Sequence, residues 1–191
     1  YREYVYDGEK QVSMLEFPEI AEHSIIIDSE SKRYSMCGVR IGCLVTRSKT
    51  LHDAAMKFAQ ARLSPVLIGQ ILATAAHDND AEYIQSVREE YTKRRNLLVE
   101  LLNEIPGVKC PTPKGAFYCV AELPVEDADD FAQWLLEHFS DNGETVMVAP
   151  ASGFYSVPEL GKKQVRIAYV LKEEDLRRSV ELIKIALEQY K

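Results

Sequence analysis

The 191-residue sequence lacks the features that mark several common classes of protein. It contains four cysteines, none of them in a Cys-x-x-Cys pair, and four histidines that do not have the spacing of metal ligands. A disulfide framework or a structural zinc site requires such groupings. We therefore predict no disulfide framework and no metal site, and we interpret all four cysteines as small buried apolar side chains.

Long apolar runs and a basic stripe are missing as well. A membrane-spanning helix needs roughly 18 to 20 apolar residues in succession, and no run reaches that length. The formal net charge is -7, and acidic and basic residues are interspersed, whereas a nucleic-acid-binding surface concentrates positive charge. We therefore expect neither a membrane nor a nucleic acid as partner. Because residues 1–4 show no signal-peptide pattern, we expect a cytoplasmic protein.

The sequence does contain ample apolar material, 46% of its residues, for one large or two small domains. Residues 23–28 form a short β-branched run, which is typical of a strand buried on both faces of a parallel sheet. Residues 38–46 are predicted to form a second strand, with glycines where backbones approach closely. The polar loop predicted between them, residues 29–37, is in a favourable place for a site.

The rest of the sequence predicts helices, followed by a smaller mixed unit. Apolar residues recur at helical spacing over residues 48–77 and are interrupted at residues 62–65, which predicts two helices. A long amphipathic helix follows over residues 80–105. The predicted strands beyond it cover residues 116–123, 145–150 and 165–170, and the predicted helices cover residues 127–140 and 173–190. The predicted class is α/β, with one domain over residues 1–79, a connecting helix over 80–106 and a small α/β domain over 107–191.

The loop between the first two strands carries the chemistry. Hydroxyl groups from Ser29 and Ser31, the amine of Lys32 and the guanidinium of Arg40 lie within a short stretch of sequence, and such donors bind phosphate groups. A lysine that is shielded from water beside another cation has a larger share of nucleophilic free amine, which can form an imine. The alternative is an ordinary surface lysine in a polar loop.

The same stretch resembles the pyridoxal-phosphate attachment signature of class I aminotransferases, the aspartate aminotransferase family. That signature has a Ser or Gly, a spacer, a small residue and the Schiff-base lysine, followed by Gly-x-Arg-x-Gly with the arginine eight residues after the lysine. Glu30 departs from it, since the family has an apolar or small residue there. The residues that match are Ser29, Ser31, Lys32, Gly38, Arg40 and Gly42.

The resemblance implies a fold and a set of roles. The fold would be the end of the large-domain sheet of pyridoxal-phosphate-dependent transferases plus a C-terminal small α/β domain. Lys32 would form the Schiff base with pyridoxal 5′-phosphate and would then move a proton as a general base. Arg40 and Ser29 would bind the cofactor phosphate, and Ser31 would either help them or hold the backbone of the loop.

Two further residues are implied by the same resemblance. Arg166, in the predicted strand over residues 165–170, resembles the arginine that binds the substrate carboxylate, where a bidentate contact would orient the substrate. Tyr1 resembles the tyrosine of an Asp-x-x-Tyr element that binds the phenolic oxygen of the cofactor, with Tyr4 as the competing candidate.

The resemblance covers the C-terminal half of a family member, and family members are homodimers. The implied activity is transfer of the amino group of an amino acid, with aspartate as the first candidate, to a 2-oxo acid such as 2-oxoglutarate. We expect the chain alone to be inactive, because the other half carries the remaining cofactor contacts. The alternatives are a non-catalytic domain of the same fold, or a related enzyme such as an alanine or aromatic aminotransferase or an aminocyclopropane-carboxylate synthase.

Overall fold

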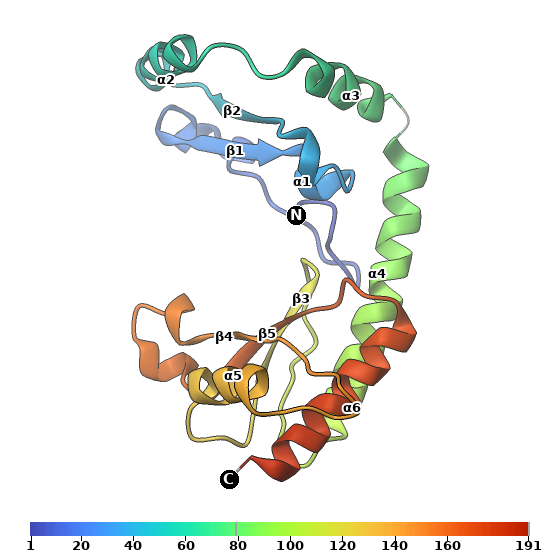
Figure 1. Ribbon diagram of the computed structural model, residues 1–191. Helices are drawn as coiled ribbons and strands as arrows, with labels where there is room; N and C mark the ends of the chain where they lie inside the picture. The colour runs from blue at the N-terminus through green and yellow to red at the C-terminus, as the bar shows by residue number, and fades with distance from the viewer. Residues whose placement is uncertain (79, 191) are drawn as a thin grey trace. The chain divides into compact units, whose positions relative to one another are not determined.

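The computed structural model describes residues 1–78 and 80–190, which form two compact units, Tyr1–Arg88 and Glu89–Lys191 (Figure 1). The division falls inside the long helix α4 (Asp80–Asn103), whereas the predicted boundaries lie at its two ends. The helix itself is confirmed. No helix among the described residues is long and apolar enough to cross a membrane.

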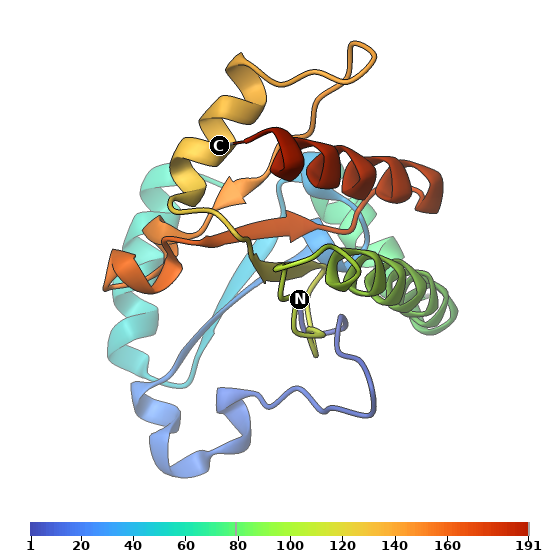
Figure 2. The same ribbon diagram turned by 90° about the horizontal axis from the view of Figure 1, so that it is seen from below.

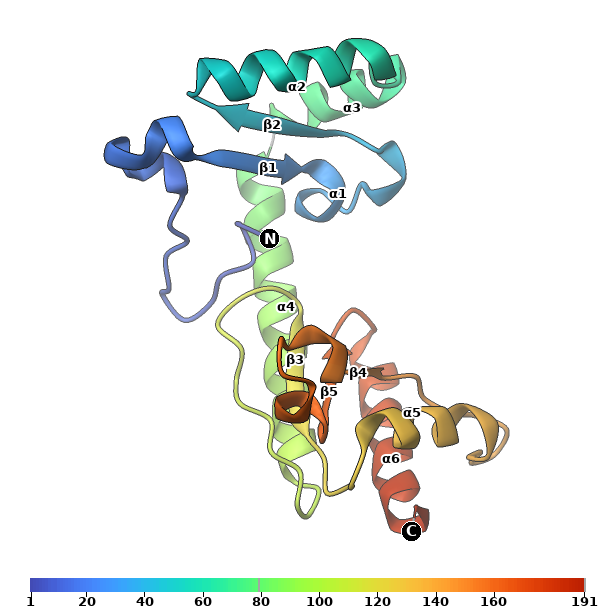
Figure 3. The same cartoon turned by 90° about the vertical axis from the view of Figure 1, so that its left-hand side faces the viewer.

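The first unit, Tyr1–Arg88, contains a two-stranded sheet, helices and short 3-10 turns (Figure 3). Strands β1 and β2 pair antiparallel, with Ile25 opposite Thr46 at one end and Ser29 opposite Gly42 at the other. Its elements before α4 are η1 (Met14–Glu16), η2 (Pro18–His23), β1 (Ile25–Ser29), α1 (Glu30–Arg33), η3 (Cys37–Val39), β2 (Gly42–Thr46), α2 (Lys49–Arg62) and α3 (Leu67–His77).

The predicted burial and pairing of β1 are wrong. The β-branched run does form a strand, but Ile25 and Ile27 are exposed and Ile26 is half-buried. The connection between the strands leaves from Ser29 and returns at Gly42, which are paired at the same end of the sheet, so β2 runs antiparallel to β1. The apolar run therefore predicted an extended backbone correctly. It did not predict the direction of the neighbouring strand or the burial of the β1 side chains.

Two more sequence predictions around this sheet need correction. Residues 30–33, which were predicted as loop, form the helical turn α1, and the Ser29 hydroxyl caps it by accepting a hydrogen bond from the Ser31 backbone N–H at 3.1 Å. The second strand begins only at Gly42, because Arg40 adopts a left-handed conformation with φ of 59°. The predicted break between α2 and α3 is confirmed.

The second unit, Glu89–Lys191, has a three-stranded antiparallel sheet in the order β3-β5-β4 (Figure 2). The predicted strand over residues 145–150 is paired only at Ala149–Pro150, which lie opposite Arg166 and Val165 of the last strand. The elements after α4 are β3 (Tyr118–Glu122), α5 (Ala128–Glu137), β4 (Ala149–Pro150), η4 (Ser152–Phe154), η5 (Pro158–Gly161), β5 (Gln164–Ala168) and α6 (Glu173–Gln189).

A single apolar core holds the second unit together. Its largest fully buried side chains come from three helices and from the β3 and β5 region: Leu98, Leu102, Cys119, Leu123, Phe131, Leu135, Val165, Tyr169, Leu176 and Ile183. Helix α5 is capped by Asp127, whose carboxylate accepts a hydrogen bond from the Asp129 backbone N–H at 2.9 Å. The core and its sheet provide a rigid support for Arg166 on β5.

Candidate functional site

The Lys32 segment is built where β1 ends and β2 begins. A side chain at Gly42 would place its Cβ 2.6 Å from the Asp28 carbonyl oxygen, so only glycine allows the two backbones to approach this closely. Lys32 lies on the turn α1, with a half-buried side chain whose Nζ is 3.7 Å from Cys37 Sγ. The helical turn thus places the amine beside η3, in the connection that leads from α1 to β2.

The three predicted phosphate ligands lie together. The Ser29 hydroxyl donates to Ser31 Oγ at 3.0 Å, and Arg40 Nη1 lies 3.5 Å from the same Ser31 oxygen. Arg40 also donates to the Cys37 carbonyl at 2.8 Å, which fixes its guanidinium beside the turn. The Ser29 hydroxyl and the Arg40 guanidinium thus both contact the Ser31 hydroxyl, and the three groups form a donor set that suits a phosphate.

The charge around this cluster is uncompensated. Among residues 1–78 and 80–190, neither Lys32 nor Arg40 has a carboxylate within ion-pair distance. Of the two nearest acidic residues in sequence, Asp28 pairs with Arg2 at 3.1 Å and accepts a hydrogen bond from the Ser29 backbone N–H at 2.9 Å, and Glu30 contacts His77 at 3.1 Å. The donor set and the primary amine therefore fit the phosphate and the aldehyde of pyridoxal 5′-phosphate.

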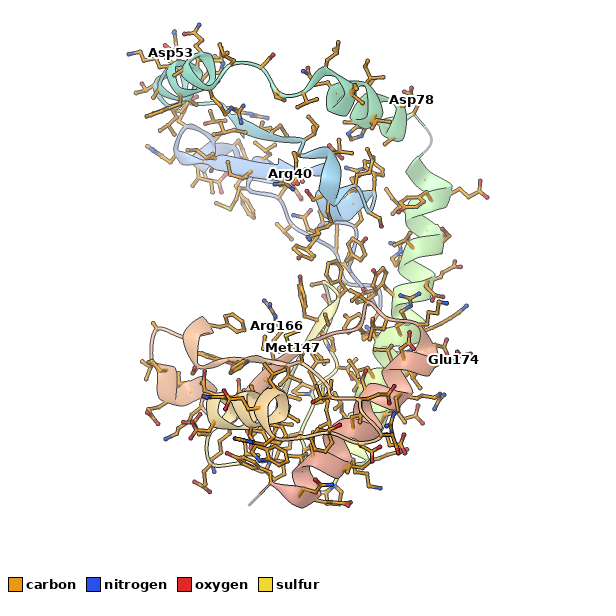
Figure 4. All side chains as sticks on the ribbon, in the orientation of Figure 1. Arg40, Asp53, Asp78, Met147, Arg166 and Glu174 are labelled. Carbon is orange, nitrogen blue, oxygen red and sulfur yellow. The ribbon has the colours of Figure 1, made fainter. Side chains whose placement is uncertain are left out.

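Arg40 is held in its unusual conformation by packing from α3. Left-handed backbone is costly for a residue other than glycine and persists where the surroundings impose it. A Cβ on Gly69 of α3 would lie 2.9 Å from the Val39 carbonyl oxygen and 3.0 Å from the Ile41 side chain, so α3 rests directly on the chain on both sides of Arg40. Figure 4 labels Arg40 in this region.

The two candidate tyrosines have different environments. The buried Tyr4 donates its hydroxyl to the backbone carbonyl of Lys32 at 2.6 Å and so ties the N-terminal segment to the turn. Tyr1 is 49% exposed, packs edge-on against the Tyr4 ring, and lines a small pocket together with Ser29. Tyr1 therefore lies at the surface beside Ser29, whereas the Tyr4 hydroxyl is bonded to the backbone of the turn.

Arg166 lies in the second unit, in the middle of β5 and opposite Val120 and Ala149 (Figure 4). Its guanidinium carbon is 4.7 Å from the centre of the Tyr118 ring and 4.8 Å from that of Phe154. It has no carboxylate partner in the described part of the chain. Aromatic faces hold a guanidinium without using its hydrogen-bond donors, so Arg166 is oriented and still able to bind a carboxylate.

Several neighbours of the site were not predicted. Tyr118 lies diagonally across the β3–β5 pair from Arg166, a contact that strand register determines and that periodicity alone does not show. The expectation that all four cysteines are buried is wrong for Cys37 and Cys43, which are exposed, and right for Cys110 and Cys119. The hydrogen bond with the neighbouring Cys110 thiol, and then burial, raise the pKa of Cys119, so this thiol stays neutral within the core.

An apolar concavity of about 750 Å³ adjoins the cluster around Lys32, between the β1–β2 sheet and α2. Its lining includes Ile27, Leu44 and Phe58, with Arg40 and Arg62 at its polar margin, and Lys32 does not take part. We call Lys32, Ser29, Ser31 and Arg40 the Lys32 cluster. The concavity shares Ser29 and Arg40 with this cluster, but the two places offer different chemistry. The cluster around Lys32, with its amine and hydroxyls, is the better candidate for a reactive site.

Comparison with known proteins agrees with this geometry. Residues 1–183 match the family model for aminotransferase class I and II. The aspartate aminotransferase of Bacillus subtilis (strain 168) is 31% identical over 198 residues, which cover 100% of this chain and 48% of that protein.

Solved structures give the same result. The aspartate aminotransferase from Rhizobium meliloti aligns with a TM-score of 0.84 and 29% identity, over 98% of this chain and 48% of that one. The aromatic aminotransferase from Pyrococcus horikoshii OT3 aligns with a TM-score of 0.86 and 26% identity, over 99% of this chain and 49% of that one. The chain thus spans about half the length of the relatives that it matches. With the family model covering almost the whole sequence, this chain belongs to the class I and II aminotransferases.

Proposed function

We propose that this chain is the lysine-bearing part of a pyridoxal-phosphate-dependent aminotransferase, which transfers the amino group of an amino acid to a 2-oxo acid such as 2-oxoglutarate. One observation carries the proposal. The Lys32 amine and the Arg40 guanidinium both lie against Cys37, and Arg40 also lies beside the Ser31 hydroxyl. Neither cation has a carboxylate partner among the described residues, and the chain belongs to this family. A reactive amine next to a phosphate-binding donor set is what this cofactor requires.

In the proposed site each residue has a separate task. Arg40 binds the cofactor phosphate through its fork of donors, and the hydroxyls of Ser29 and Ser31 turn from each other toward the same oxygens. The Lys32 amine holds the cofactor covalently. When bound, the cofactor supplies a conjugated ring that accepts electrons as a bond to the substrate Cα breaks.

Lys32 has a second task once the substrate has taken its place. Its free amine accepts the proton from the substrate Cα and returns it at a neighbouring carbon as a general base and acid. Such transfer requires a fixed approach of the amine, and the hydrogen bond from Tyr4 to the Lys32 carbonyl holds the backbone from which the side chain extends.

Arg166 would bind the carboxylate that all α-amino acids share. The Tyr118 and Phe154 rings hold its guanidinium in one orientation, so less side-chain entropy is lost when a carboxylate binds. A bidentate contact at this position orients the substrate, and other residues determine which substrate side chain is accepted.

The proposal extends to a whole protein that is longer than this chain, because the relatives are about twice as long as the chain. We infer from the Lys32 and Arg166 motifs that the chain corresponds to the C-terminal half, that the complete enzyme is a cytoplasmic homodimer, and that the chain alone is inactive. Aspartate is the first candidate substrate because several relatives are named aspartate aminotransferase. An aromatic amino acid is the second candidate, on the likeness to the aromatic aminotransferase.

The cofactor assignment can be tested on the chain itself. Incubation with pyridoxal 5′-phosphate, reduction with borohydride and peptide mass mapping should label Lys32 at concentrations that leave the exposed Lys49 unlabelled. The Arg40→Ala variant should lower labelling of Lys32 about tenfold, because a hydrogen bond to a charged group contributes about 1.5 to 3 kcal/mol. Pyridoxal without phosphate should not distinguish this variant from the wild type.

Equal labelling of Lys32 and Lys49, or no effect of Arg40→Ala, would contradict the assignment. The reaction itself is measured in a protein that joins this chain to the remaining half, with aspartate, alanine and aromatic amino acids and 2-oxoglutarate as acceptor. Transamination that survives Lys32→Ala would reject the catalytic role of Lys32, and a joined protein that binds the cofactor without any turnover would favour the non-catalytic alternative.

A further inference from the structure

The turn that carries Lys32 has two faces. Glu30 and Tyr34 are four residues apart, so they lie on the same face of the helical turn α1 and its C-cap. Lys32 is two residues from each of them and therefore points to the other side. Whatever binds both Glu30 and Tyr34 determines how the turn, and with it the Lys32 side chain, is oriented.

His77, the last residue of α3, contacts both of these residues. Its Nε2 is 3.1 Å from a carboxylate oxygen of Glu30, and its Nδ1 is 3.1 Å from the Tyr34 hydroxyl. The imidazole also packs edge-on against the Tyr34 ring, with 5.4 Å between the ring centres. One side chain from α3 thus spans the face of the turn opposite Lys32.

The chemistry of the three groups determines the direction of the two bonds. An ionised carboxylate only accepts hydrogen bonds, so Nε2 must carry the proton and donate to Glu30. In the neutral imidazole the other nitrogen is then an acceptor, and the Tyr34 hydroxyl donates to Nδ1. The cluster therefore selects one tautomer of His77, in a chain of hydrogen bonds from Tyr34 through His77 to Glu30.

Burial makes these contacts consequential for Glu30. Its side chain is only 16% exposed, and its second carboxylate oxygen is buried without a hydrogen-bond partner among the described residues. Since an unsatisfied buried charge is costly, the bond from His77 matters more to Glu30 than a typical surface contact would. His77 itself is 47% exposed, so replacing it leaves little cavity.

Glu30 is also the one position of the lysine signature at which this sequence departs from the family pattern. A carboxylate in place of an apolar or small residue requires a donor, and the donor in this chain is His77. Two other groups lie near the His77 contacts. The Arg33 guanidinium is 5.2 Å from the centre of the Tyr34 ring, and the hydroxyl of Tyr83 of α4 donates to Ser35 Oγ at 3.1 Å. They add contacts to the turn and do not replace the bond to Glu30.

We infer that His77 is a positioning residue for Lys32, acting through Glu30 and Tyr34 to hold the turn in one orientation. The inference deepens the proposed function and rests on it for the role of Lys32. We call the pair of contacts from His77 to Glu30 and Tyr34 the clamp. The clamp is a property of the chain alone, and it can be measured without the cofactor.

Amide hydrogen exchange of the chain tests the clamp directly. His77→Phe keeps an aromatic ring against Tyr34 but removes both nitrogens, and it should speed exchange in residues 31–35 about three- to tenfold, as expected for the loss of one or two hydrogen bonds. His52→Phe is the matched control, because among the described residues the His52 ring makes a polar contact only with its neighbour Asp53. Exchange in the second unit should not change in either variant.

Two further measurements separate positioning from general support. The ring nitrogen spectrum of His77 should show the proton on Nε2, and His77→Gln, whose amide can still donate to Glu30, should restore slow exchange in part. Tyr34→Phe keeps the ring and loses only the hydroxyl, so it should also speed exchange at the turn if His77→Phe cannot be folded. A proton on Nδ1, or wild-type exchange in both His77→Phe and Tyr34→Phe, would overturn the inference.

Labelling with pyridoxal 5′-phosphate and borohydride then connects the clamp to Lys32. If Lys32 is labelled selectively in the wild type, His77→Phe should lower that selectivity about three- to tenfold, and His52→Phe should not. Selective labelling that is unchanged in His77→Phe rejects the positioning role. Absence of selective labelling in the wild type rejects the proposed function instead, while the exchange data still decide whether the clamp exists.

Discussion

The two units of this chain bury their apolar residues very differently. In Glu89–Lys191 the large apolar side chains of α4, α5, α6 and β5 meet in one core, where Phe131 is 0% exposed. In Tyr1–Arg88 many apolar side chains of β1, α2 and α3 are exposed instead, and Phe58 is 79% exposed. The exposed set of the first unit includes Ile27, Leu44, Met56, Phe58, Leu63, Val66, Leu67, Ile68, Ile71 and Leu72.

This difference shows that element formation and core formation are separate problems. Helices α2 and α3 have the spacing and the breaks of ordinary amphipathic helices, yet their apolar faces have little cover among the described residues. Exposed apolar surface of this extent is typical of a surface that a partner or a ligand covers. The first unit also holds the Lys32 cluster, so we expect the complete site to depend on that cover, whereas the second unit is stabilised by its own core.

The sharpest test of this comparison uses two phenylalanines. Phe131→Ala should lower the free energy of unfolding by about 3 to 5 kcal/mol, because a fully buried ring is lost and a cavity remains. Phe58→Ala should change it by less than about 0.5 kcal/mol, because the ring is already exposed. Denaturant unfolding monitored in each unit measures both values. A large loss in Phe58→Ala would show that the ring is covered in solution and would end the contrast between the units.

The Lys32 segment provides a smaller but more local test. Gly42→Ala should destabilise the first unit by about 1 to 3 kcal/mol, because its Cβ would overlap the Asp28 carbonyl oxygen. Gly38→Ala, in the same segment, is the matched control, since a Cβ there meets no atom within 4 Å. Hydrogen exchange across β1 and β2 reports the difference. Equal effects of the two substitutions would mean that the close strand approach is not what stabilises this end of the sheet.

A helix cap should matter in the second unit even though its core is complete. Asp127→Ala removes the side chain that caps α5 and should cost about 1 kcal/mol in thermal or denaturant unfolding. Glu126→Ala is the neighbouring control and should be close to neutral, because the Glu126 side chain is almost fully exposed. A neutral Asp127→Ala would indicate that tertiary packing alone maintains the start of α5.

The smallest effect is expected on the surface of the second unit. Arg178 pairs with Asp141, Glu144 and Glu181, and these partners raise its pKa, so it stays charged throughout the accessible pH range. Arg178→Ala should lower the unfolding midpoint slightly at low salt, and about 1 M salt should remove the difference. A difference that persists in salt would mean that Arg178 acts by packing.

The sequence by itself determined much of this protein. Hydrophobic periodicity identified the long helix α4, the break between α2 and α3, and the closing helix α6, because these patterns are local and need no partner. The spacing of Lys32, Arg40 and the flanking glycines identified the family, because a signature of this kind depends only on fixed positions along the chain.

Only the tertiary structure decided the rest. Four features depend on strand register or on contacts between residues that are distant in sequence. They are the antiparallel direction of β1 and β2, the left-handed backbone at Arg40, the rings beside Arg166, and the contacts of His77 with Glu30 and Tyr34. Burial followed the same rule, since an apolar side chain is covered only where another element packs on it. The same kinds of apolar pattern therefore gave a closed core in one unit and an exposed surface in the other.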